Sequence, residues 1–102
     1  MLEAIRKMFG GSSTDLREVI QNGAVIIDVR STGEYSTGHA KGSVNIPLDR
    51  LQAKLSGLDK NKPVITCCAS GMRSSSAKSL LLSNGFKEVH NAGPWQNILK
   101  YQ

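Results

Sequence analysis

Two short apolar runs constrain the fold of this chain more than any other feature. The first covers residues 24–29, with Asp28 near its end, and the second covers residues 64–67. Strands that expose one face to water alternate apolar and polar residues, whereas these runs are almost continuously apolar. They therefore predict strands buried on both faces, which is typical of a parallel sheet that helices cover on each side.

The segments around these runs carry the spacing and the stop signals of short helices. Leucines recur at helical intervals between residues 48 and 58, and Asn-Gly pairs at 22–23 and 84–85 would end two helices. Pro47 ends a brief strand. The predicted helices lie at 15–21, 34–35, 48–58, 77–83 (capped by the serines at 74–76) and 94–98, and the strands at 24–29, 44–46, 64–67 and 86–91. Strands that alternate with helices indicate an α/β fold with a central parallel sheet.

The length and the composition fit one domain with one core. The chain has 102 residues, of which 39% are hydrophobic and 21% charged, and it contains no internal repeat. A Gly-Gly-Ser-Ser stretch at 10–13 predicts a hinge, so we expect an N-terminal helical extension and hinge at 1–12 and a single domain at 13–102. Apolar side chains between residues 2 and 9 would let the extension pack on the domain, or dock on a membrane surface or a partner.

The charge of the chain is basic but dispersed. Thirteen Lys and Arg residues against eight Asp and Glu give a formal net charge of +5, which favours anionic partners. The basic residues form no run, and the chain has only one Trp, two Tyr and two Phe. Nucleic-acid binding is therefore not expected, and small anions fit the pattern better.

Neither the cysteines nor the N-terminus points to a secreted, metal-binding or membrane protein. Cys67 and Cys68 are adjacent, which gives neither a disulfide framework nor the C-x-x-C spacing of a zinc site. The first residues lack the apolar region of a signal peptide, and no stretch approaches the length of a membrane span. We therefore expect a cytoplasmic monomer that needs no metal or cofactor and binds no membrane.

The segment from Cys68 to Ser74, Cys-Ala-Ser-Gly-Met-Arg-Ser, has the layout of a nucleophilic cysteine site. It follows an apolar strand and precedes a helix, and sites in parallel sheets form beyond the carboxyl ends of the strands. N–H groups at the helix start, and a nest of loop N–H groups that Gly71 allows, would lower the pKa of the thiol. Arg73 adds a permanent positive charge. The same donors would hold an anionic substrate.

The two cysteines are predicted to have different roles. Neighbouring residues of a strand point to opposite faces, so only one cysteine can face the loop. Because the loop follows Cys68 directly, we predict Cys68 as the nucleophile and Cys67 as a small buried core residue. A resolving thiol and one half of a vicinal disulfide stay open as other roles for Cys67.

Three stretches together resemble the rhodanese-like sulfurtransferases and, among stand-alone members, the phage-shock-protein-E type. They are Ile-Asp-Val-Arg at 27–30 with Glu-Tyr at 34–35 and Gly-His-Ala-Lys-Gly-Ser-Val-Asn-Ile-Pro at 38–47, the loop at 68–74, and Val-His-Asn-Ala-Gly-Pro-Trp at 89–95. Together they cover roughly residues 13–99. The resemblance implies a three-layer α/β/α domain around a central parallel sheet of about five short strands.

The resemblance also implies the activity of a sulfurtransferase that carries sulfane sulfur as a persulfide on Cys68. A donor such as thiosulfate would load the cysteine and release sulfite, and an acceptor such as cyanide would take the sulfur in a ping-pong scheme. The loop would cradle the persulfide through Ala69, Ser70, Gly71, Met72, Arg73 and Ser74, and Arg73 would help bind the anionic donor or shape the loop. A sulfur-accepting protein or a thiol is the other acceptor that the resemblance leaves open. Two positions depart from the family pattern, since Pro94 stands where a second glycine is commoner and Met72 where a polar residue is usual.

Four residues outside the loop are candidates for lining the pocket or supporting it. Asp28 and Arg30 stand at the end of the first apolar run, and we expect an ion pair between Arg30 and Glu34. His39 lies in a loop flanked by glycines, where a structural hydrogen bond is a better expectation than catalysis. Trp95 is expected in the core or at the rim of the pocket.

Other functions compete with small-molecule sulfur transfer. Cysteine phosphatases and arsenate reductases have a similar loop with five residues between the cysteine and the arginine, whereas four residues separate Cys68 from Arg73. The shorter loop suits a single sulfur atom better than a tetrahedral phosphate. A persulfide carrier that passes sulfur to a partner protein would use the same residues as the enzyme. A purely regulatory module would lack the nucleophile.

Overall fold

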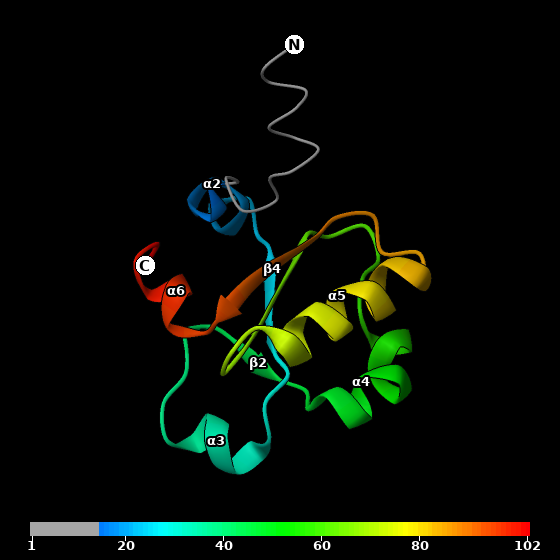
Figure 1. The fold of residues 1–102 in the computed structure, drawn as a ribbon. Helices are drawn as coiled ribbons and strands as arrows, with labels where there is room; N and C mark the ends of the chain where they lie inside the picture. Colours follow the sequence, from blue (N-terminus) through cyan, green and yellow to red (C-terminus); the bar gives the residue numbers. More distant parts are fainter. Residues whose placement is uncertain (1–14) are drawn as a thin grey trace.

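The computed structural model describes residues 15–102 of the chain (Figure 1). The predicted extension and hinge at 1–12, and with them the predicted domain boundary, lie outside the described residues. Within the described part, short helices and strands alternate along the chain as the sequence predicts.

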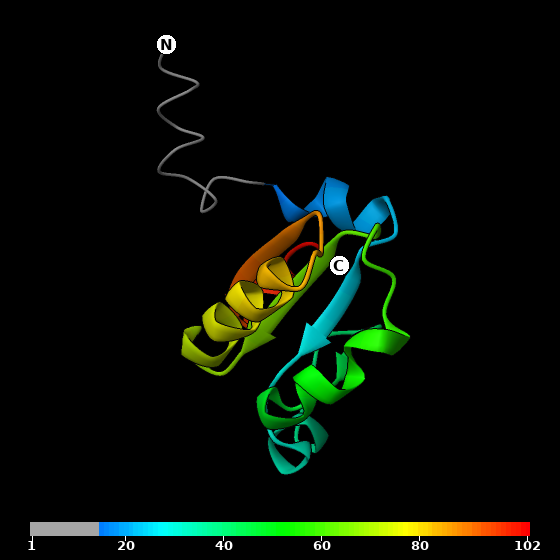
Figure 2. The ribbon, with the colours of Figure 1, turned by 90° about the vertical axis from the view of Figure 1, so that its right-hand side faces the viewer.

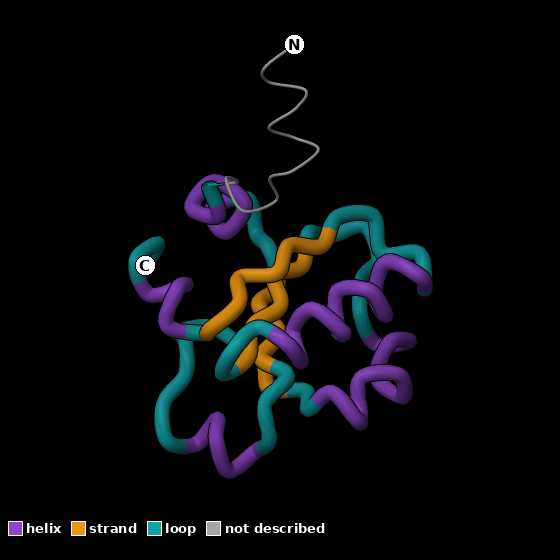
Figure 3. The backbone as a smooth tube through the Cα atoms, in the orientation of Figure 1, coloured by secondary structure: helices purple, strands orange, loops and turns teal. Residues whose placement is uncertain are grey.

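Four parallel strands form the sheet of the described residues, in the order β2-β1-β3-β4 (Figure 3). Their bounds are β1 (Val25–Asp28), β2 (Val44–Asn45), β3 (Val64–Cys68) and β4 (Val89–Pro94). The two apolar runs supply the central pair, β1 and β3, and every residue of β3 is buried. The predicted α/β fold with a parallel sheet is confirmed, with four strands where about five were expected.

Helices cover both faces of the sheet and make a three-layer arrangement (Figure 2). On one face α4 and α5 lie side by side and bury Leu51 and Leu81 in the larger core cluster. On the other face α2 and α6 contribute Leu16 and Ile98 to a second cluster. The helices are α2 (Leu16–Gln21), α3 (Thr32–Ser36), α4 (Leu48–Lys54) with the 3-10 turn η2 (Leu55–Gly57) after it, α5 (Met72–Ser83) and α6 (Gln96–Leu99).

The helix α5 begins earlier than the sequence predicted, at Met72 rather than after the serines at 74–76. Its N-cap is Gly71, which has a φ of 101°, in the left-handed region that glycine enters without a steric penalty. The turn at Gly71 closes the loop within a few residues. As a result Ser74 lies in the first turn of the helix, where its N–H and hydroxyl are directed at Cys68.

The last strand, β4, lies later in the chain than the predicted range of 86–91. Phe86 is buried, and its N–H donates to the carbonyl oxygen of Leu81 at 3.1 Å, so this residue completes the end of α5 instead of pairing with β3. The strand then continues to Pro94, which pairs in register with Cys68. This shift brings β4 alongside Cys68.

Candidate active site

The two adjacent cysteines lie on opposite faces of the sheet. Cys68, the last residue of β3, belongs to the core cluster packed under α4 and α5, whereas Cys67 belongs to the cluster on the other face. Both thiols are free, and both side chains are fully buried. A disulfide between them would require one side chain to cross to the other face, so the strand geometry favours separate roles.

The sulfur of Cys68 is enclosed by the loop that follows it. The Gly71 N–H donates to Sγ at 2.9 Å and the Ser74 N–H donates at 3.4 Å. The thiol itself donates to the Ser74 Oγ at 3.3 Å, and that hydroxyl donates to the Gly71 carbonyl oxygen at 3.1 Å. A hydroxyl can rotate, so after loss of the thiol proton the Ser74 hydroxyl is placed to donate to the sulfur.

These contacts lower the pKa of the Cys68 thiol. Burial is the largest single influence and raises the pKa, but the hydrogen bonds from Ser74, Gly71 and Ser70 together outweigh it. N–H donors at the start of a helix stabilise a thiolate over a thiol. Among the described residues, no carboxylate or imidazole group hydrogen-bonds to Sγ. The thiolate is thus stabilised by the loop and not by a neighbouring base.

Replacing Ser74 with alanine should make Cys68 less nucleophilic at neutral pH. The variant keeps the backbone N–H but loses the hydroxyl, so the pKa of the thiol should rise and the pH profile of alkylation should move to higher pH. We expect iodoacetamide to modify Cys68 several-fold more slowly at neutral pH. The exposed neighbour Ser75 offers a matched control in Ser75→Ala, which should leave the profile in place. An unchanged profile for Ser74→Ala would assign the effect to the backbone donors alone.

The surroundings of Cys67 raise the pKa of its thiol, whereas those of Cys68 lower it. Burial and the charge of Asp28 raise the pKa of Cys67 to about 12, although Arg30 acts in the other direction. A buried thiol that stays protonated is a poor nucleophile. The structure therefore supports the predicted core role of Cys67.

Arg30 forms its ion pair with Asp28, so the predicted pair between Arg30 and the Glu34 side chain is wrong. The Arg30 Nε lies 3.0 and 3.1 Å from the two Asp28 carboxylate oxygens, and its Nη2 lies 2.8 Å from Oδ2. Residues two apart in extended chain point to the same side, which brings these two charges together locally. The remaining donors bind the carbonyl oxygens of Glu34 at 3.3 Å and Gly38 at 2.7 Å. The buried pair thus ties α3 to the end of β1.

The Arg73 side chain binds Glu34. The Arg73 Nη1 lies 2.7 Å from the Glu34 Oε1, and the Arg73 Nη2 lies 2.9 Å from the Glu34 Oε2. The Glu34 Oε1 also accepts hydrogen bonds from the N–H and the hydroxyl of Ser31, which forms a capping box at the start of α3. Arg73 and then Ser31 lower the pKa of Glu34 to about 2. The pair joins α3 to the first turn of α5 and compensates the positive charge of Arg73.

This pair should make a small, pH-dependent contribution to stability. The pKa of Glu34 is lowered from 4.5 to about 2, so the contribution should be present above about pH 4.5 and lost as the pH falls towards 2. Both side chains are more than a third exposed, at 38% and 39%, so water screens the pair. We expect urea unfolding to show a slightly lower free energy of unfolding for Glu34→Gln than for wild type near neutral pH. This deficit should disappear in acid. A deficit that is constant with pH would show that the charge of Glu34 is not its cause.

The structure does not bring His39 to the sulfur. Its ring stacks on Tyr35 with the ring centroids 3.7 Å apart, and its Nδ1–H donates to the Tyr35 carbonyl oxygen at 2.8 Å. The residue is exposed beyond α3. These contacts support the predicted structural role. The rim of the loop is instead formed by Ala69, Ser70 and Met72, all exposed.

Two contacts that the sequence did not reveal hold the loop in place. The buried Thr66 hydroxyl donates to the Ser74 carbonyl oxygen at 2.9 Å, and the Trp95 N–H donates to the Cys68 carbonyl oxygen at 2.8 Å. A hydroxyl in a fully buried apolar strand needs an acceptor, so Thr66 was a recognisable signal. Trp95 is partly buried, and the Arg30 guanidinium lies 5.1 Å from its ring centroid.

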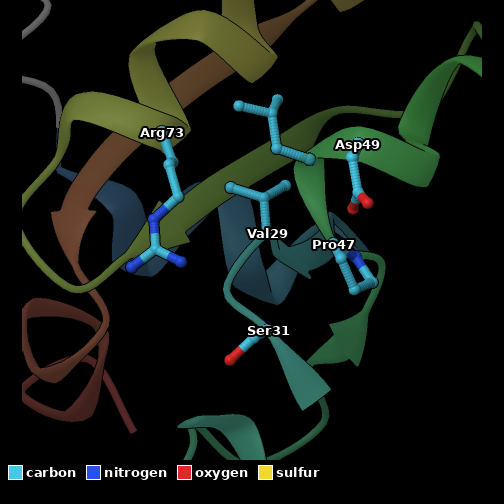
Figure 4. Close-up of a pocket in the computed structure, with 6 residues that line it drawn as sticks. Val29, Ser31, Pro47, Asp49 and Arg73 are labelled. Atoms are coloured by element: carbon cyan, nitrogen blue, oxygen red, sulfur yellow. The ribbon is translucent and has the colours of Figure 1, made fainter. Parts of the chain in front are cut away.

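A pocket of about 320 Å³ opens beside this site (Figure 4). It is lined by two residues after β1, three at the start of α4 and one on α5: Val29, Ser31, Pro47, Leu48, Asp49 and Arg73. The Val29 N–H donates to the Cys67 carbonyl oxygen at 3.0 Å, which continues the pairing of β1 with β3 and places Val29 beside Cys68. Val29 and Cys68 also belong to the same core cluster.

No group of three or more His, Cys, Asp or Glu side chains within residues 15–102 is arranged to hold a metal ion. In the same part of the chain, every helix is too short or too polar to cross a membrane. The cytoplasmic location and the monomeric state stay predictions.

A sequence profile of the rhodanese-like domain matches residues 12–93, which is most of the chain. The chain belongs to the rhodanese-like domain family. This rhodanese-like protein is similar to the thiosulfate sulfurtransferase PspE of Escherichia coli (strain K12), with 36% identity over 74 residues that make up 71% of each protein. These matches confirm the family that the three sequence stretches predicted.

Two other comparisons extend this picture of the rhodanese-like protein. A solved structure of a rhodanese with anions from Escherichia coli aligns with a TM-score of 0.70 and 35% identity, over 74% of this chain and 92% of the other. The putative sulfur carrier protein YrkF of Bacillus subtilis (strain 168) is 38% identical over 69 residues, which are 68% of this chain. The matched segment spans 37% of YrkF and 54% of a second Bacillus subtilis relative, so both of those proteins are considerably longer than the segment they share.

Proposed function

We propose that this rhodanese-like protein is a thiosulfate sulfurtransferase that carries the transferred sulfur as a persulfide on Cys68. The proposal rests on the N–H and hydroxyl groups of Gly71 and Ser74, which surround Sγ at the carboxyl end of β3. Such donors stabilise a thiolate before the reaction and the negative outer sulfur of a persulfide after it. The similarity to PspE supports thiosulfate as the donor.

The reaction has two balanced steps. The Cys68 thiolate attacks the outer sulfur of thiosulfate, so that a bond from Sγ to this sulfur forms while the S–S bond of thiosulfate breaks and sulfite leaves with the electron pair. Cyanide, as a test acceptor, then attacks the outer sulfur of the persulfide. The bond to Sγ breaks, thiocyanate leaves and the Cys68 thiolate is regenerated. No proton has to move in either step, which fits a site without a general base.

The direction of Arg73 favours sulfur transfer over phosphoryl or arsenate chemistry. A phosphatase of related fold needs its loop arginine on the substrate anion, whereas both terminal nitrogens of Arg73 are bound to Glu34. The loop is also one residue shorter than the phosphatase pattern. We therefore place Arg73 as an anchor of the first turn of α5.

The proposed function can be tested on the purified protein with thiosulfate as the only substrate. After excess thiosulfate is removed, the intact mass should rise by about 32 Da, one sulfur atom, and one sulfite should be released per protein. Addition of cyanide should restore the original mass and yield thiocyanate. A folded protein whose mass does not change would rule out thiosulfate as the donor.

A persulfide carrier is a second candidate, and the similarity to the putative sulfur carrier YrkF favours it. Met72 is 79% exposed at the rim of the loop, where a protein acceptor would make contact. Multiple turnovers with cyanide would not separate the two functions, because both use the same persulfide. Protein loaded from radiolabelled thiosulfate separates them: a carrier should pass label to one protein of a native extract faster than to small thiols, and Met72→Glu should slow only that transfer.

A further inference from the structure

The pocket beside Cys68 has a volume of about 320 Å³, which is in the range of sites that bind organic molecules. Its floor is apolar, because Val29, Pro47 and Leu48 line it. These features fit the hydrocarbon part of an organic substrate.

The pocket lies beside the loop that follows Cys68. Val29 lies across the β1–β3 pair from Cys68, in the same core cluster, and forms part of the lining. Arg73, one residue before Ser74, closes the other side. A molecule in the pocket therefore lies next to the loop that encloses Sγ.

The two charged residues of the lining, Arg73 and Asp49, differ in whether another side chain compensates their charge. Arg73 and Asp49 flank Val29 (Figure 4). The Arg73 guanidinium is compensated by the bidentate contact with Glu34. Asp49 is exposed at the start of α4, and no hydrogen bond or ion pair involves its side chain within residues 15–102. The uncompensated charge of the pocket is therefore negative, which suits a cationic group.

We infer that this pocket binds the sulfur acceptor, and that the acceptor is a small aliphatic thiol with a primary ammonium group. The inference rests on the proposed persulfide on Cys68. The hydrocarbon stem would lie on Val29, Pro47 and Leu48 with the ammonium at Asp49. The acceptor thiolate attacks the outer sulfur of the persulfide, so that a new S–S bond forms in the acceptor and the bond to Sγ breaks. The product is an organic persulfide, and the Cys68 thiolate keeps the electron pair.

The test compares acceptors of different charge on protein already loaded with sulfur. Cysteamine is the cationic acceptor, 2-mercaptoethanol the neutral one, mercaptoacetate the anionic one, and cyanide the control that needs no pocket. Single-turnover rates are measured for wild type, Asp49→Asn and the matched control Asp59→Asn, which changes an exposed carboxylate in the turn before β3. For each thiol, the single-turnover rate of the variant is divided by that of wild type, so that intrinsic differences in thiol reactivity cancel.

Asp49→Asn should slow transfer to cysteamine about two- to fivefold, the effect of losing one exposed ion pair. The rate with 2-mercaptoethanol should not change, and the rate with mercaptoacetate should rise. Loading by thiosulfate, a dianion, should be as fast as in wild type or faster. Asp59→Asn should leave all rates unchanged. Equal rates with cysteamine in wild type and Asp49→Asn, or an equal loss for all three thiols, would overturn the inference.

Failure of the proposed donor is distinguishable from failure of this inference. If thiosulfate adds no sulfur to Cys68, the protein is loaded with inorganic polysulfide, and the same ratios decide whether the pocket selects an aminothiol. If loading succeeds and the ratios do not depend on the charge of the thiol, the persulfide mechanism stands and the aminothiol subsite is rejected.

Discussion

Cys68→Ser should abolish persulfide formation and reduce thiosulfate:cyanide sulfurtransferase activity at least about a thousandfold, because it removes the only thiol held by the loop donors. A serine hydroxyl is not ionised near neutral pH and cannot hold sulfane sulfur in a comparable way. The measurement combines the rate of thiocyanate formation with the intact mass after exposure to thiosulfate. The variant should show neither product nor added mass.

The neighbouring cysteine provides the matched control. Cys67 faces the opposite side of the sheet, and burial raises the pKa of its thiol, so Cys67→Ala should keep the persulfide and most of the activity. Cys67→Ala should lower the free energy of unfolding modestly, because it shortens a buried side chain. Persulfide on the Cys68→Ser variant, or its loss in a folded Cys67→Ala variant, would contradict the assignment of the nucleophile.

The largest effect on stability is expected at Asp28. This carboxylate is fully buried and accepts hydrogen bonds from the backbone N–H and the guanidinium of Arg30. Asp28→Asn leaves a buried arginine without its counter-charge, which should lower the free energy of unfolding by about 3–5 kcal/mol. Urea unfolding followed by circular dichroism measures this loss.

A double variant keeps this prediction testable if Asp28→Asn does not fold. Replacing both partners, in Asp28→Leu with Arg30→Met, removes the two charges together and should be less destabilising than Asp28→Asn alone. Because Arg30 also holds the carbonyl oxygens of Glu34 and Gly38, the double variant should loosen α3. A loss below about 1 kcal/mol for Asp28→Asn would show that the pair is solvated in solution.

The features that the sequence predicted correctly depend on residues close together in the chain. The runs at 24–29 and 64–67 specify strands buried on both faces, because an uninterrupted apolar segment is stable only when both sides are covered. Strand alternation by itself predicts that Cys68 and Cys67 face opposite sides of the sheet. The Asn-Gly pair at 84–85 ended α5 where expected, since α5 stops at Ser83 with Asn84 as its C-cap.

The arrangement of the site depends on contacts between distant segments, which no local pattern encodes. Arg73 was expected to help bind the donor or to shape the loop, and its partner Glu34 lies 39 residues away in the chain, because folding places the starts of α3 and α5 together. The pocket likewise joins the end of β1 to the starts of α4 and α5. The prediction of Cys68 as the nucleophile therefore follows from its neighbours in the chain. The lowered pKa of the Cys68 thiol and the pairing of Arg73 with Glu34 follow from packing. The donors, charges and pocket walls around Sγ come together only in the folded domain.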